Sequence, residues 1–185
     1  MTLARAGLLR GSFVPPTKLR ELRLIARQRQ KLVGQLASEK NRLYKVLTES
    51  GIRLGTVVSD LHGQSARAML KAIIAGQPPH EVLKFVSRRL RASREEIFDA
   101  LQGELTASHQ FVLNELMQHI EVIEARIARF DTTNFRVNLR ANGTHWRCCK
   151  PSPGVELIGA AMLLVEIGTD MDAFGTSSRL SSWAR

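Results

Sequence analysis

One stretch of this sequence constrains the fold more than any other, an unbroken series of apolar residues near the middle of the chain. Its members follow one another at spacings of 3, 4, 3, 4 and 3 and are Leu113, Leu116, Ile120, Ile123, Ile127 and Phe130. Such spacing places all six side chains on one face of a helix and is typical of a coiled-coil seam. Burying each of them is worth roughly 1.5–3 kcal/mol, so we expect this helix to have a partner.

Residues 17–50 predict a second long helix, which is one candidate for that partner. We expect Thr17 to cap it and Gly51 to stop it. Its apolar residues follow a heptad spacing, although Arg29 and Glu39 interrupt the stripe. These apolar residues are Leu22, Ile25, Leu32, Leu36, Leu43, Val46 and Leu47.

The seam helix has three open arrangements: an antiparallel hairpin with residues 17–50, pairing with the same helix of a second chain, or both. Acidic residues on the seam helix could face the basic first helix, which favours the hairpin and removes some positive charge from the surface. These are Glu115, Glu121 and Glu124. A homo-oligomer formed through the six seam residues remains a prediction beside the hairpin.

Short helices are predicted between the two long ones. Residues 66–75 and 80–91 have helical apolar spacing, and Gly76 separates them. Ser93, followed by Glu96 three residues later, is a capping-box pattern that begins a further helix. The sequence therefore predicts a mainly α fold, with long antiparallel coiled-coil helices and a short-helix insert.

Residues 131–152 have no period and predict an irregular linker, which contains His145, Cys148 and Cys149. Adjacent cysteines seldom hold one zinc ion together, and no second ligand pair lies nearby, so we predict no metal site there. Residues 155–167 predict a helix of small residues that Gly168 ends.

The last twenty residues contain three closely spaced carboxylates, Glu166, Asp170 and Asp172. Because Gly168 is expected to end the helix between them, we interpret the two aspartates as turn and cap residues. The sequence thus predicts neither a metal site nor a catalytic residue in this part of the chain.

Positive charge is concentrated in the first half of the sequence. The chain has a net charge of +10; residues 1–94 contain 19 Lys/Arg against 5 Asp/Glu, whereas residues 95–133 contain 2 against 8. This layout predicts a polyanion partner, and an aromatic content of only 5% favours phosphate contacts from helices over base stacking. The candidate nucleic-acid-binding side chains are Lys18, Arg20, Arg23, Arg27, Lys31, Arg42, Lys45, Arg88, Arg89 and Arg91.

Composition also bears on where the protein is found. The sequence has no apolar run of about 18 residues, so we expect no membrane span. Its first residues contain too short an apolar stretch for a secretory signal. The two cysteines are neighbours and cannot join distant segments, which predicts a reducing, cytoplasmic location of bacterial type.

Three stretches together resemble a known family: "GLLRGSFVPPTKLRELR" with "NRLYKVLTESGIRL" after it, then "VVSDLHGQSARAMLKAIIAG", then "PGVELIGAAMLLVEIGTDMDAFGTSSRLSSWA". In this order they are similar to insertion-sequence transposases that join an N-terminal DEDD, resolvase-like domain to a C-terminal serine domain. The resemblance implies DNA transposition and recombination, binding of DNA and of a structured guide RNA, and oligomer assembly through the coiled coil. It also implies a divalent metal such as Mg²⁺ in the intact enzyme.

The resemblance divides the chain into four parts: the end of the DEDD domain (1–16), the helical linker and coiled coil (17–130), a divergent linker (131–152) and the start of the serine domain (153–185). The family's acidic motifs match positions before Gly7 and its Ser-Gly motif matches positions after Trp183. We therefore expect an internal fragment that lacks catalytic residues, and no cofactor bound to it.

The stretch "PGVELIGAAMLL" resembles the turn of a helix-hairpin-helix, in which Gly154 and Gly159 would let the backbone approach a phosphate. Glu156 stands where the family has glycine, and its carboxylate would repel phosphate. A plain tight turn before a core helix is the alternative interpretation.

Three functions follow from these observations. The first is a transposase fragment that binds nucleic acid and oligomerises without cutting. The second is a non-catalytic interaction module that modulates an intact transposase through its oligomer. The third is the product of a decayed reading frame.

Overall fold

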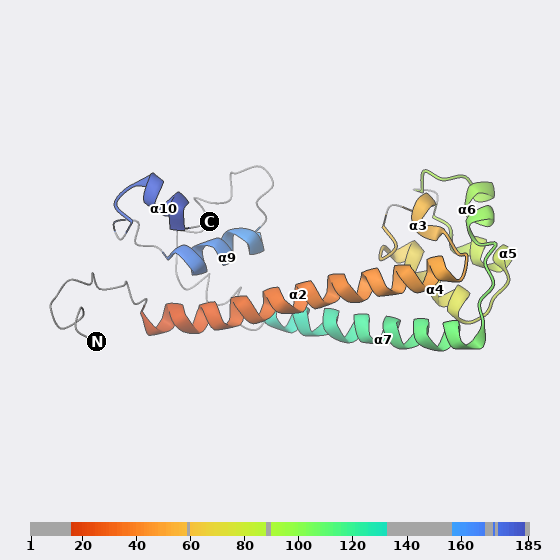
Figure 1. Cartoon of the computed structure of the whole chain (residues 1–185), viewed down its shortest axis with the longest axis horizontal. Helices are drawn as coiled ribbons and strands as arrows, with labels where there is room; N and C mark the ends of the chain where they lie inside the picture. The colour runs from red at the N-terminus through yellow and green to blue at the C-terminus, as the bar shows by residue number, and fades with distance from the viewer. Residues whose placement is uncertain are drawn as a thin grey trace. The chain divides into compact units, whose positions relative to one another are not determined.

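The computed structural model describes residues 16–58, 60–87, 90–132, 157–168, 172 and 174–183. The regular elements within these ranges are all helices, which confirms the predicted mainly α class. They are α2 (Thr17–Glu49), α3 (Leu54–Val57), α4 (Gln64–Ile74), α5 (Pro79–Val82), the 3-10 helix η1 (Leu83–Phe85), α6 (Arg94–Ala100), α7 (Ala107–Phe130), α9 (Leu157–Ile167) and α10 (Ser177–Trp183) (Figure 1).

The chain divides into two compact units, each described below by itself. Unit 1 comprises Met1–Lys31 and Ala128–Arg185, and unit 2 comprises Leu32–Ile127. Both α2 and α7 contribute residues to each unit. None of the helices in the described part of the chain is long and apolar enough to cross a membrane.

In unit 2, the second half of α2 packs against α7 as an antiparallel hairpin. The pairing is antiparallel because Lys40 of α2 faces Glu124 of α7, whereas Leu47, further along α2, lies in one cluster with Leu113, near the start of α7. The predicted hairpin is therefore present within a single chain, as Figure 1 shows.

The short-helix insert covers the end of this hairpin and completes one hydrophobic core. Met69 and Leu70 of α4 and Ile97 of α6 are fully buried with the hairpin residues. Gly51 and Gly76 end α2 and α4 with φ of 83° and 73°, a backbone conformation that glycine adopts without strain. These two stop signals were predicted correctly.

Helix starts agree with the sequence at one predicted cap and disagree at the other. At α6, the Glu96 N–H donates to Ser93 Oγ at 3.1 Å and the Ser93 N–H donates to Glu96 Oε2 at 2.7 Å, so the capping box is confirmed. The predicted cap at Thr17 is wrong, because Thr17 is already helical. The Arg20 N–H donates instead to the carbonyl of Pro16 at 3.1 Å.

The predicted helix over residues 80–91 is confirmed only in its first part, which forms α5 and η1. Helical structure ends at Phe85, and Val86 is extended with ψ of 117°. Val86 and Leu90 still pack against the core of unit 2. Their apolar spacing thus reflects packing against the core at positions beyond the end of the helix.

Unit 1 has a much smaller core, between the first half of α2 and α9. Ala26, Ala161 and Val165 are buried, and Leu22 and Met162 pack beside them. Helix α9 ends at Ile167, and Gly168 follows with φ of 90°. The predicted helix over 155–167 and its glycine stop are confirmed for residues 157–168; the turn with Gly154 and Glu156 lies outside the described residues.

Candidate nucleic-acid interface

The first half of α2 carries a row of basic side chains. Arg20, Arg23, Arg27 and Lys31 follow one another at spacings of 3, 4 and 4, which places them on one face of the helix. Within residues 17–31, Lys18 and Arg29 add two further positive charges, and the single acidic residue is Glu21. We call Arg20, Arg23, Arg27 and Lys31 the basic row.

Two members of the basic row are held by the C-terminal end of α9. The Arg23 guanidinium donates to the carbonyls of Val165 at 3.0 Å and Glu166 at 2.7 Å, which α9 leaves without helical partners. Arg27 donates from Nε and Nη2 to the two carboxylate oxygens of Glu166, each at 2.9 Å. These contacts join α2 to α9 within unit 1.

Electrostatics at this junction follow from the same contacts. The hydrogen bond from Arg27, reinforced by the charges of Arg27 and Arg23, lowers the pKa of Glu166, while partial burial opposes the shift. The hydrogen bond to Glu166 and the charge of that carboxylate raise the pKa of Arg27. Glu166 is therefore a carboxylate near neutral pH, and Arg27 remains cationic.

The remaining candidates on this half of α2 are open to solvent. Lys18, Arg20 and Lys31 are exposed, and no described carboxylate pairs with them. Arg29, which the sequence treats as a break in the apolar stripe, is mostly buried and binds Asp131 at 2.6 Å. The interruption at Arg29 thus has a structural partner, and that partner lies 102 positions away in the sequence.

The candidates in unit 2 have different surroundings. Arg42 pairs with Glu39 at 3.1 Å and Lys45 pairs with Glu49 at 3.8 Å, both along α2. Arg91 is exposed, whereas Arg88, Arg89 and Gly154 lie outside the described residues. Gly159 lies on α9, is exposed and has open space where a side chain would begin.

The basic segment of the sequence (1–94) and the acidic segment after it (95–133) do not correspond to the two compact units of the structure. Unit 2 contains 12 Lys/Arg against 11 Asp/Glu, because basic residues before position 95 and acidic residues after it share one compact body. Unit 1 contains 15 against 6. The excess positive charge of the protein is therefore concentrated in unit 1.

An ion-pair cluster in unit 2 shows how its charges cancel. Glu124 of α7 accepts from Arg67 of α4 and lies 3.7 Å from Lys40 of α2, while Glu121 pairs with Lys71 at 2.9 Å. The hydrogen bond from Arg67 lowers the pKa of Glu124. The expected approach of acidic α7 residues to the basic first helix is confirmed for Glu124, whereas Glu121 contacts α4.

The six seam residues mostly face the interior of the single chain. Leu113, Ile120 and Ile123 are buried, and Leu116, Ile127 and Phe130 are half-buried. Met117, which the seam pattern does not include, is also buried. The seam is thus covered to a large extent by the chain's own helices. Oligomerisation through it remains a prediction.

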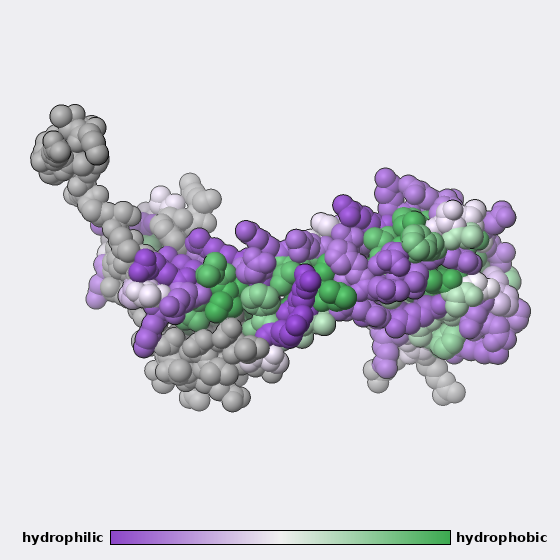
Figure 2. All heavy atoms as spheres, turned by 90° about the horizontal axis from the view of Figure 1, so that it is seen from below, coloured by the Kyte–Doolittle hydropathy of each residue, from purple (hydrophilic) through white to green (hydrophobic). Residues whose placement is uncertain are grey.

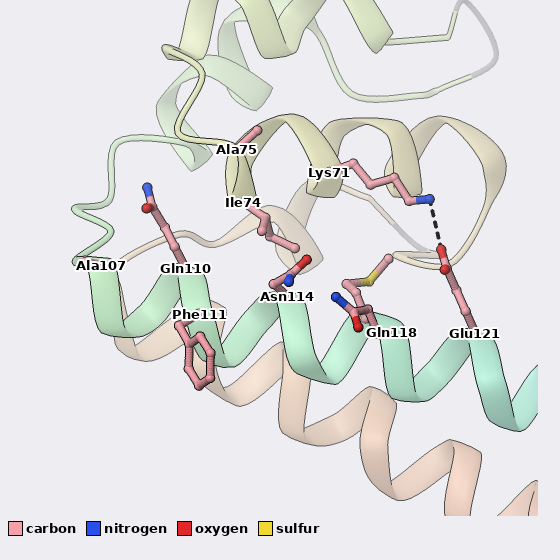
Figure 3. A pocket seen from close by; sticks show the side chains of 10 residues that line it. Lys71, Ile74, Ala75, Ala107, Gln110, Phe111, Asn114, Gln118 and Glu121 are labelled. Atoms are coloured by element: carbon pink, nitrogen blue, oxygen red, sulfur yellow. Dashed lines mark ion pairs between the residues drawn. The ribbon is translucent and has the colours of Figure 1, made fainter.

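Unit 2 also has a groove between α4 and α7 (Figure 3). Ile74 and Met117 contribute apolar surface, and the Lys71–Glu121 ion pair lies at one end. Gln110, Asn114 and Gln118 line it from successive turns of α7, and the Phe111 ring points away from α4. The groove contains amides and one closed ion pair, which are suited to hydrogen bonding.

Metal ligands and catalytic groups were not predicted for this chain. Across the described ranges, no three His, Cys, Asp or Glu side chains come together in a way that could hold a metal ion. His145, Cys148, Cys149 and Asp170 lie outside those ranges, and Asp172 lies in a turn before α10.

Some residues that shape these sites gave no signal in the sequence. Ala26 forms the floor of the α2–α9 contact, and Glu39 is buried on α2 beside Arg42 and 3.9 Å from His119. A buried alanine is detectable only from helical spacing, and a buried glutamate only from knowledge of its partner.

Comparison with known proteins gave no match: no family model, no curated protein and no solved structure is similar enough to this chain to count as a relative.

Proposed function

We propose that this chain binds the phosphate backbone of nucleic acid through the first half of α2, as part of the DNA transposition machinery of an insertion sequence. The observation that carries the proposal is the concentration of positive charge in unit 1, against a nearly neutral unit 2. The family resemblance of the sequence supports the transposition context. Duplex DNA and structured RNA share the phosphate chemistry that such a surface recognises.

The exposed side chains on one helical segment suit this role. Lys18, Arg20 and Lys31 have long flexible stems, face solvent and lie within 15 residues of continuous helix. A basic helical segment of this kind contacts backbone phosphates without reading base edges. We therefore expect binding that depends strongly on salt and weakly on sequence.

The test compares two triple variants by filter binding to duplex DNA and to a structured RNA at several salt concentrations. Lys18→Ala/Arg20→Ala/Lys31→Ala should flatten the plot of log K against log salt by about 0.9 for each duplex DNA phosphate that the variant no longer neutralises. The control, Arg42→Ala/Lys45→Ala/Arg91→Ala, removes the same charge from unit 2 and should leave the slope nearly unchanged.

Two outcomes would contradict the proposal. One is no binding of the unaltered protein to either nucleic acid at low salt. The other is an equal decrease of affinity in both triple variants, which would mean that net charge alone, and not the α2 surface, attracts the ligand. A difference between DNA and RNA would assign the preferred nucleic acid.

Oligomerisation is a second candidate function, favoured by apolar side chains on the outer face of α7. Phe111 and Val122 are 67% and 48% exposed, and their separation of 11 positions places them on the same helix face. We propose that self-association, if the protein is an interaction module, uses this face in addition to the seam. Light scattering on Phe111→Asp/Val122→Asp should then report a smaller species than the unaltered protein, and an unchanged mass would contradict it.

A further inference from the structure

The contact between Arg27 and Glu166 has the geometry of an arginine bound to a phosphate group. Two guanidinium nitrogens each meet one carboxylate oxygen at 2.9 Å, and this two-point arrangement is also how arginine grips phosphate oxygens. Arg27 is on the exposed face of α2, with 64% of its side chain accessible, and it lies between Arg20 and Lys31 in the basic row. The carboxylate thus occupies the central position of the surface assigned to nucleic acid.

We propose that Glu166 is an autoinhibitory competitor for phosphate, which holds Arg27 in the free protein and releases it to the nucleic-acid backbone. The inference rests on the proposed function. In the free protein the binding surface consists of Lys18, Arg20 and Lys31, and displacement of the carboxylate by a phosphate adds Arg27 to it.

Arg23 has a different role from Arg27 at the same junction. Only 18% of its side chain is accessible, and its hydrogen bonds go to two backbone carbonyls at the end of α9. Carbonyls that end a helix retain their need for a donor when a phosphate approaches. Arg23 therefore stays in place and keeps α9 attached while Arg27 exchanges partners.

The distinguishing experiment measures the affinity and salt dependence of duplex DNA binding for Glu166→Gln. This variant keeps the size of the side chain and removes the charge that holds Arg27. We expect about tenfold tighter binding at low salt, since an arginine hydrogen bond to a charged group is regained by the ligand. The log–log salt slope should change little, because Arg27 neutralises the same phosphate in both complexes and only the competing carboxylate is removed.

Glu21→Gln is the matched control, because it raises the net charge equally and its exposed side chain lies on the same half of α2. It should tighten binding only slightly and leave the slope unchanged. Arg27→Ala supplies a second test: it should affect DNA binding little in the unaltered protein and should abolish the whole gain when combined with Glu166→Gln.

The results of these measurements distinguish a failure of the competitor role of Glu166 from a failure of the proposed nucleic-acid binding. Equal effects of Glu166→Gln and Glu21→Gln, or a gain that survives Arg27→Ala, would overturn the competitor role while the binding function stands. Absence of binding by the unaltered protein would instead remove the function itself. Circular dichroism should show unchanged helix content in Glu166→Gln. The two Arg23 hydrogen bonds to backbone carbonyls and the buried Ala26–Ala161–Val165 contact do not involve the carboxylate, and among the contacts of Arg23 only the longer 3.9 Å ion pair with Glu166 is lost.

Discussion

Units 1 and 2 use the same two residue classes, basic and apolar, for different ends. Unit 2 buries a continuous core to which α2, α3, α4, α5, α6 and α7 all contribute, and it contains nearly equal numbers of basic and acidic residues. In the described part of unit 1, the cluster between α2 and α9 consists of the small buried residues Ala26, Ala161 and Val165, and the sequence of this unit has a large positive excess. One continuous helix, α2, contributes to both, so the difference arises from what packs against each half of it.

The surface of the molecule can be compared with this difference between the units. Figure 2 shows hydrophilic side chains over most of the described face, with apolar patches between them. Charge in unit 2 supports the fold, because Glu124 links α2, α4 and α7. On the first half of α2, Glu166 pairs with Arg23 and Arg27, and Asp131 pairs with Arg29. Within the described ranges, Lys18, Arg20 and Lys31 have no acidic partner. The surface proposed to bind a polyanion therefore lies where the fold does not already supply acidic partners.

The largest effect that would test this contrast is the truncation of a core side chain in unit 2. Ile120→Ala should lower the free energy of unfolding by about 2–5 kcal/mol, because removal of the fully buried side chain leaves a cavity between α7 and the rest of the core. Urea denaturation monitored by circular dichroism measures it. Val122→Ala, two residues away and half exposed, should change stability by less than about 0.5 kcal/mol.

Ile120 is also an example of what could be predicted from the sequence. The period of the seam predicted a buried face on α7, and the seam at Leu113, Ile120 and Ile123 is buried. The period could not name the partner, because it describes one helix only. Capping and glycine signals at Ser93, Gly51, Gly76 and Gly168 were equally local and were confirmed.

The candidate site was predicted less well, since it depends on contacts between distant segments. The basic residues of α2 were identified from charge, yet nothing in the sequence shows that Arg27 meets Glu166 139 positions later. The helix expected over residues 80–91 is shorter than predicted and ends at Phe85. Its apolar spacing recorded burial correctly, but burial against an existing core does not require a helix.

Replacing a glycine by alanine should lower the stability of the protein at Gly103 of unit 2 and raise it at Gly159 of unit 1. A Cβ on Gly103 in unit 2 would lie 2.6 Å from Ile52 Cγ1 and 2.7 Å from Ile52 N, so Gly103→Ala should destabilise the protein by about 1–3 kcal/mol. Gly159→Ala in unit 1 meets open space within a helix and should stabilise α9 by up to about 1 kcal/mol.

Thermal denaturation of both glycine variants gives the sign, and DNA binding of Gly159→Ala adds a second readout. If Gly159 is needed for close approach of a phosphate, the alanine variant binds more weakly although it is more stable. Stabilisation by Gly103→Ala would contradict the close backbone approach that the structure shows at that position.

Acid should weaken unit 2 through Glu124. Arg67 lowers the pKa of this carboxyl below its ordinary value of 4.5. Its stabilising contribution is therefore complete above the unfolded pKa and disappears as the pH falls through the lowered folded value. Near neutral pH, Glu124→Gln should cost about 1–2 kcal/mol, because a hydrogen bond to a charged group is replaced by a weaker one at a partly exposed site.

The difference in the free energy of unfolding between Glu124→Gln and the unaltered protein should decrease as the pH is lowered below the ordinary pKa of glutamate. Denaturation at a series of pH values measures this difference. Glu115→Gln on the same helix is the control, since this exposed side chain has no ion-pair partner in the described part of the chain. A pH-independent difference for Glu124→Gln would mean that its effect is one of packing.

Helix caps provide the finest comparison between the units. At α6 of unit 2, Ser93 Oγ accepts from the Glu96 N–H at 3.1 Å and the Ser93 N–H donates to the Glu96 carboxylate, so Ser93→Ala should cost about 1 kcal/mol. Thr176 at α10 of unit 1 accepts one long bond of 3.4 Å from the Arg179 N–H and has no return partner. Thr176→Ala should therefore cost only a few tenths of a kcal/mol, at the low end for a cap. Hydrogen exchange of the first amides of α6 and α10 measures the two cap effects separately. An equal decrease of protection in Ser93→Ala and Thr176→Ala would show that the cap of α10 contributes as much as the cap of α6.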